Sequence, residues 1–153
     1  MNFWGSVIGG ALNGAVETVL RPNVESLFGQ LGLAFTDHGN GNFDLCVDGG
    51  VFGRRHLYVL LDGKITTLYL ASVAEVSNGN VVAALGHLLL MRNKDLSLGS
   101  WLAREKASGN IGFAVSYAAL TAGLDAVRFG SICESICEEV NAADKYMRSK
   151  GLI

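Results

Sequence analysis

Residues 81–120, VVAALGHLLLMRNKDLSLGSWLAREKASGNIGFAVSYAAL, contain the clearest structural pattern in the chain. The first part of this stretch places apolar side chains three and four residues apart, which predicts a helix with one apolar stripe. The polar residues 93–95 end this helix, and Gly99 opens the next element. Two alternating segments then meet at 108–110, where SGN has the composition of a tight turn. The stretch therefore predicts a helix followed by a β-hairpin. The apolar stripe consists of Val81, Leu85, Leu88 and Leu89.

The second strand of this hairpin has one face of large side chains and one face of small ones. Small side chains let another layer approach closely, or they leave room for a ligand. We therefore keep open the possibility of an apolar cleft beside this strand. The large face carries Ile111, Phe113, Val115 and Tyr117, and the small face carries Gly112, Ala114, Ser116 and Ala118.

Three alternating segments upstream predict three more strands, at residues 43–48, 55–61 and 64–73. Glycine turns at 49–50 and 62–63 separate them, so neighbouring strands must run antiparallel. The preceding run 37–42, DHGNGN, has the composition of a loop.

The N-terminal part of the chain contains the only proline, Pro22. We predict a break at 21–23, because proline suits the first turn of a new helix. This second helix carries the apolar residues Val24, Leu27 and Phe28. Residues 1–16 before it have no charged side chain and many glycines. We interpret them as a helix packed on the domain or on a partner subunit, with a membrane-surface anchor or a loosely ordered tail as alternatives.

The C-terminal part predicts a long helix from Thr121, as N-cap, to about Arg148, with apolar residues recurring every three or four positions. The predicted order is α-α-β-β-β-α-β-β-α. This is an α+β fold in which a five-stranded antiparallel sheet packs against helices. We divide the chain into a Gly-rich helical segment, residues 1–20, and a single α+β domain, residues 21–153.

The composition indicates a protein with partners. Of 153 residues, 50% are hydrophobic and 17% are charged. We interpret this apolar excess as burial in an oligomer, with a bound apolar partner or a membrane contact as alternatives. The net charge is −2 with no basic cluster, which argues against nucleic-acid binding, and we expect no membrane contact. Three widely spaced cysteines imply no disulfide framework, and we expect a cytoplasmic location.

The sequence offers no motif for chemistry. We find no nucleophile signature and no phosphate-binding loop in the right context. The three histidines have no metal-ligand spacing, and Cys133 and Cys137 fit the apolar stripe of the last helix. We therefore expect no catalytic residue, no metal and no cofactor, and a protein that is not an enzyme. Trp101 is a large aromatic residue of the kind that fills a core or anchors an interface.

These elements together resemble a known family. The order of elements is similar to that of the YbjN-like domains. It consists of a helix that ends in Leu88, Leu89 and Asn93, then Gly99 and Trp101, a hairpin and a long last helix. Those domains share the fold of the type III secretion chaperones. The resemblance spans roughly residues 23–147. It implies a non-catalytic α+β domain, commonly a homodimer, that holds an extended segment of a client protein or has a regulatory role.

The resemblance also implies contact residues by position. We predict a dimeric, chaperone-like or regulatory protein-binding module with a client or regulatory protein as partner. The alternative is a small-molecule or lipid-binding domain that uses an apolar cleft between sheet and helices. The implied dimer contacts are Leu85, Leu89, Trp101 and Ala103, and the implied client contacts are Leu27, Phe28, Phe43 and Leu45.

Overall fold

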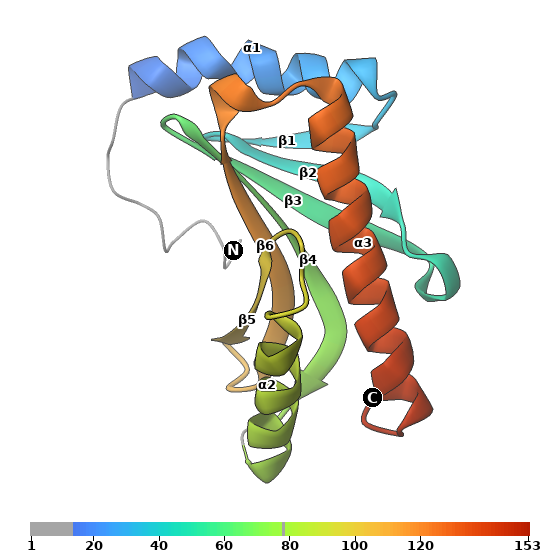
Figure 1. Ribbon diagram of the computed structural model, residues 1–153. Helices are drawn as coiled ribbons and strands as arrows, with labels where there is room; N and C mark the ends of the chain where they lie inside the picture. The colour runs from blue at the N-terminus through green and yellow to red at the C-terminus, as the bar shows by residue number, and fades with distance from the viewer. Residues whose placement is uncertain (1–13, 78) are drawn as a thin grey trace.

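A computed structural model describes residues 14–77 and 79–153 (Figure 1). Within these residues, six strands form one antiparallel sheet in the order β1-β2-β3-β4-β6-β5, and three α-helices accompany it. The elements are α1 (Gly14–Gln30), β1 (Phe35–Gly39), β2 (Asn42–Asp48), β3 (Arg54–Asp62), β4 (Ile65–Val76), α2 (Asn80–Arg92), β5 (Ser100–Glu105), β6 (Ile111–Leu120) and α3 (Ala126–Ser149).

The predicted α+β class with an antiparallel sheet against helices is confirmed, but the sheet has six strands and not five. The extra strand is β1, whose last three residues belong to the run 37–42 that we predicted to be a loop. Gly39, Asn40 and Gly41 have φ angles of 80°, 50° and 70°, so they form a tight turn and the residues on either side pair as a hairpin. The helix predicted over 1–16 lies almost entirely outside the described residues.

The predicted helix break at 21–23 is wrong, because α1 continues through Pro22. An internal proline removes one backbone hydrogen bond. Burial of Val24, Leu27 and Phe28 in the core offsets this loss and keeps the helix whole. The division between residues 20 and 21 stays a prediction, and its boundary falls inside α1.

The predicted N-cap of α3 is also wrong. Asp125 is the N-cap, and its carboxylate accepts a hydrogen bond of 2.7 Å from the backbone N–H of Arg128. Thr121 instead belongs to the end of the sheet. Its backbone N–H donates to the carbonyl of Lys64, and its hydroxyl is 2.8 Å from the hydroxyl of Thr66.

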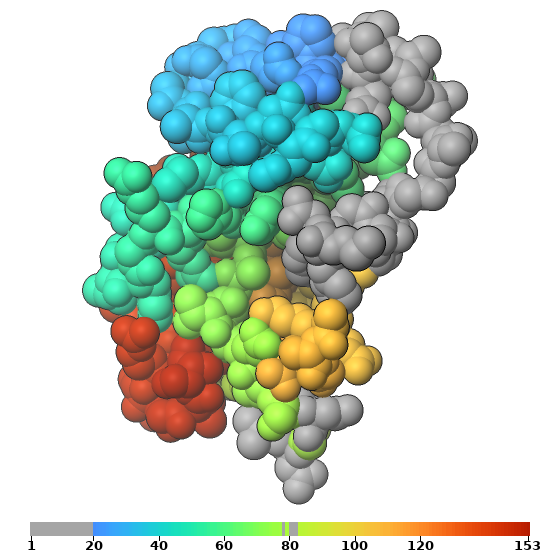
Figure 2. Space-filling view, turned by 180° about the vertical axis from the view of Figure 1, so that it is seen from behind, coloured from blue at the N-terminus to red at the C-terminus, as the bar shows by residue number. Residues whose placement is uncertain are grey.

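One face of the sheet and all three helices share a single hydrophobic core. In Figure 1, α3 runs across this face, α1 lies over one end, and α2 lies beside β5. Seen from behind, strands form the described surface between α1 and the C-terminal end of α3 (Figure 2). The large face of β6, with Phe113 and Val115, belongs to the core. Its small face is on the other side of the sheet, so these small residues do not line a space between sheet and helices, and the predicted ligand cleft stays a prediction.

A buried ion pair fixes α3 to the sheet. Arg55 in β3 donates to Asp144 in α3 at 2.7 Å, and these side chains are only 7% and 0% exposed. Asn141 accepts a second hydrogen bond from the same guanidinium. Asp144 also accepts from the hydroxyl of Ser72 and from the backbone N–H of Val73, where the pairing of β4 is irregular. Because each charged group has several partners, the pair is tolerated inside the core.

Candidate partner-binding site

Helix α2 presents apolar side chains both to the core and to solvent. Leu85 and Leu89 are each 2% exposed and fill the core. On the other side of the helix, Leu90 is 66% exposed and Met91 is 47% exposed. Ala83 and Ala84 are exposed as well. This second apolar face of α2 has no cover among the residues that the structure describes. This exposed apolar face could have been predicted from the sequence, because the helix is apolar around most of its circumference.

A shared carboxylate sets the position of α2. Glu139 in α3 accepts hydrogen bonds of 2.6 and 2.7 Å from the guanidinium of Arg92, which ends α2. It also accepts one of 2.7 Å from the indole Nε1 of Trp101 in β5. Burial raises the pKa of Glu139, but the hydrogen bonds from Arg92 and Trp101 outweigh burial and leave this pKa lowered. The ionised carboxylate therefore connects three elements.

The turn between α2 and β5 explains the motif residues. The side-chain oxygen of Asn93 accepts from the backbone N–H of Trp101 at 2.6 Å, and its amide donates to the carbonyl of Trp101 at 3.3 Å. Gly99 has a φ angle of 78°, and a Cβ at this position would lie 2.6 Å from the carbonyl oxygen of Ser116. Only glycine fits there without a shift of the backbone.

The dimer residues predicted by position lie mostly inside the chain. Leu85, Leu89 and Trp101 are buried at 2%, 2% and 4% exposure. Ala103 is exposed on β5, which is one edge of the sheet. The predicted dimer role stays a prediction. Leu85 and Leu89 lie on the buried side of α2, opposite the exposed Leu90.

The predicted client residues also belong to the core. Leu27, Phe28, Phe43 and Leu45 are at most 6% exposed. Above them, at the opposite sheet edge from β5, Phe35 of β1 is 41% exposed. Its ring centroid lies 5.0 Å from that of Phe28 and 6.1 Å from that of Phe43. Phe35 was not predicted as a contact residue, because it stands just before the predicted loop 37–42 and no strand was expected there.

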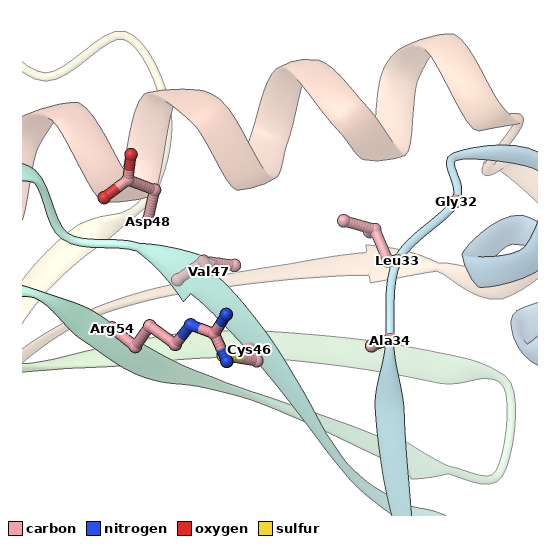
Figure 3. Close-up of a pocket in the computed structure, with 7 residues that line it drawn as sticks. All are labelled: Gly32, Leu33, Ala34, Cys46, Val47, Asp48 and Arg54. Carbon is pink, nitrogen blue, oxygen red and sulfur yellow. The ribbon is translucent and has the colours of Figure 1, made fainter.

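A groove of about 380 Å³ lies next to Phe35, at the start of β1 and the end of β2 (Figure 3). One wall is the connection from α1 to β1, and the other is the end of β2 with the start of β3. We call this the edge groove. Its lining residues are Gly32, Leu33, Ala34, Cys46, Val47, Asp48 and Arg54.

The described residues do not bring His, Cys, Asp and Glu side chains together into a metal site. No group of three or more His, Cys, Asp or Glu side chains among them is arranged to hold a metal ion. Burial raises the pKa of the Cys133 thiol to about 12 and also raises that of Cys137, so both stay protonated at neutral pH. None of the helices in the described ranges combines the length and the apolarity needed to cross a bilayer.

Comparisons with known proteins establish the fold. No family model matches the chain, and no curated protein matches its sequence. Among solved structures, it is similar to YbjN from E. coli, described as a proposed transcription regulator. That match has a TM-score of 0.65 and 14% identity, and it covers 86% of this chain and 93% of YbjN.

A second similar structure is a chain of the HopA1-SchA chaperone–effector complex. The TM-score is 0.60 at 11% identity, and the match covers 84% of this chain and 95% of that one. The predicted YbjN-like, chaperone-like fold is therefore confirmed. At these identities the likeness concerns the fold alone.

Proposed function

We propose that this chain is a homodimeric, non-catalytic protein-binding module that holds an extended segment of a partner protein in the manner of a chaperone. One observation carries the proposal. Helix α2 fills the core with Leu85 and Leu89, and still exposes Leu90 and Met91. Large exposed apolar surfaces on soluble domains mark interaction sites.

The dimer contact would be formed by the exposed face of α2 together with the neighbouring edge strand β5. In a two-fold dimer, the same surface of each copy faces itself, so it must not repel its own charge. The only formally charged side chain in α2 is that of Arg92, and it is bound to Glu139. The α2 helices of two copies can therefore pack with their Leu90 and Met91 side chains in contact, because no like charges face each other there.

The partner segment would bind on the β1 side of the sheet, where the open edge of β2 extends beyond β1. An unpaired strand edge accepts an extended peptide through backbone hydrogen bonds, and side-chain pockets then give selectivity. Phe35 supplies an exposed apolar contact at this edge, and the edge groove lies next to it. The likeness to a chain from a chaperone–effector complex supports a protein partner. A cytoplasmic location stays a prediction from cysteine usage.

A peptide selection tests the binding function. Random dodecapeptides displayed on phage are selected on the immobilised full chain, and the enriched peptides are measured by fluorescence anisotropy. We expect alternating apolar peptides whose affinity falls about threefold or more in Phe35→Ser. The control Val127→Ser changes a side chain that is 80% exposed on α3, and should leave affinity unchanged. Circular dichroism checks that both variants fold. If no peptide is enriched, the proposed function fails.

A further inference from the structure

The backbone of β2 has an open edge inside the edge groove. The N–H of Cys46 donates to the carbonyl of Ala34, and so faces β1, whereas the N–H of Gly49 donates to Gly53 and faces β3. Because backbone groups alternate in direction along a strand, the N–H and C=O of Asp48 face the groove. The chain does not continue β1 beside Asp48, since Gly32, with a φ angle of 63°, turns it toward α1.

Beside this open edge lies a cation, Arg54, that has no partner among the described residues. Arg54 is exposed, and none of the described residues forms an ion pair or hydrogen bond with its guanidinium. In Figure 3 the guanidinium reaches under β2 to the side of Cys46. The nearby carboxylate of Asp48 points away from it and accepts a hydrogen bond of 2.8 Å from the N–H of Gly50. The positive charge of Arg54 therefore remains available to an occupant of the groove.

We infer that the edge groove selects an extended partner segment that carries an aspartate or glutamate side chain, with Arg54 as the residue that recognises the carboxylate. This inference rests on the proposed protein-binding function and specifies its partner. Leu33 and Val47 give the groove partly buried apolar walls, so the guanidinium is the feature that distinguishes one polar side chain from another. A guanidinium binds a carboxylate through two parallel hydrogen bonds.

The register of the sheet places the acidic residue. Cys46 is paired with His56 and Asp48 with Arg54, so the register places Cys46 and Arg54 on one face of the sheet, whereas the carboxylate of Asp48 turns away toward the N–H of Gly50. An occupant residue that exchanges both backbone hydrogen bonds with Asp48 puts its side chain on that same face, next to the guanidinium. A residue in the interior of a bound segment has both a backbone N–H and a C=O, which can pair with Asp48. A C-terminal carboxylate would itself bind the cation and could not form the same pair of backbone hydrogen bonds. We therefore assign the site to an internal acidic side chain.

A charge reversal tests the inference. The phage library is selected in parallel on the full wild-type chain, on Arg54→Glu and on Lys145→Glu, a matched control with the same charge change on an exposed position of α3. We expect acidic residues to be enriched at one peptide position by wild type and control, and lysine or arginine to replace them on Arg54→Glu. Exchange of that acidic residue for glutamine should weaken binding to the wild type about threefold to tenfold, and should strengthen binding to Arg54→Glu, where the exchange removes the repulsion between two carboxylates.

Amide hydrogen exchange gives a second readout, because a bound segment should slow exchange of the Asp48 N–H. Peptides enriched without an acidic preference, or with the same preference on Arg54→Glu, would overturn the inference and leave the protein-binding proposal standing. If neither the wild-type chain nor either variant enriches any peptide, both the inference and the protein-binding proposal are overturned.

Discussion

The indole Nε1 of Trp101 donates a 2.7 Å hydrogen bond to Oε1 of Glu139, the same oxygen that accepts a 2.6 Å hydrogen bond from Nε of Arg92. One carboxylate of α3 thus connects the edge strand β5 with the end of α2. The orientation of the exposed α2 face consequently depends on a group that lies beneath it.

Replacement of this carboxylate should cost stability in a pH-dependent way. The pKa of Glu139 is lowered in the folded chain, so its contribution is complete above the ordinary value of 4.5 and is lost as the pH falls through the lower folded value. We expect Glu139→Gln to lose about 1–3 kcal/mol of unfolding free energy at pH 7. The difference from wild type should shrink below pH 4.5, as measured by urea unfolding across pH.

The neighbouring exposed Glu138 provides the control, because Glu138→Gln removes the same charge without the two donors. Equal losses in both variants, or a loss for Glu139→Gln that does not change with pH, would contradict the role given to this carboxylate.

Two glycines should respond to alanine in opposite directions. Gly99→Ala forces a side chain into positive φ and against the carbonyl oxygen of Ser116, and should lose about 2 kcal/mol or more. Gly86 lies in the middle of α2, where an added methyl group would meet no other atom within 4 Å, so Gly86→Ala should gain about 0.5–1 kcal/mol. Thermal unfolding of both variants measures the two effects. A tolerated Gly99→Ala would show that the α2–β5 turn differs from the one described.

Replacement of Asp144 in α3 should lower the unfolding free energy more than replacement of Asp125 at the N-cap of the same helix. Asp144→Ala leaves the buried Arg55 without its carboxylate and should lose about 3–5 kcal/mol. Asp125→Ala removes only a helix cap, and should lose about 1 kcal/mol. Urea unfolding at pH 7 compares them. Losses of similar size would mean that the ion pair between β3 and α3 is not buried as described.

The sequence predicted those parts of the fold that depend on local patterns. The turn residues Asp62 and Gly63 and the SGN run at 108–110 each mark a hairpin, and the alternation on either side fixes which residues face the core. The long last helix was equally clear from its apolar spacing. The hairpin of β1 and β2 could not be predicted in this way. The five residues of β1 include three that have the composition of a turn, so the strand shows no alternation of apolar and polar side chains.

The candidate site was harder to predict, for a physical reason. Apolar periodicity identifies residues that face the core, and the eight residues carried over by resemblance were mostly of this kind. Leu90 and Phe35 are exposed because no helix or strand of the described residues packs over them, and this depends on the whole tertiary structure. Arg55 stands at a core position that no local pattern explains, since Asp144 comes from the other end of the chain.

The proposed assembly depends on the exposed face of α2, so its mutation should divide the dimer. Leu90→Glu places a charge in the centre of the proposed contact, where it would face its own copy across the two-fold axis. The fold should persist, because Leu90 is 66% exposed in the single chain. Val127→Glu introduces the same charge at a more exposed position of α3 and should leave assembly unchanged.

Light scattering coupled to size-exclusion chromatography, on the full chain and on these two variants, tests the central claim most directly. We predict twice the chain mass of 16.2 kDa for wild type and Val127→Glu, and the single chain mass for Leu90→Glu at the same concentration. A wild-type mass of 16.2 kDa, or a dimer that Leu90→Glu leaves intact, would contradict the account.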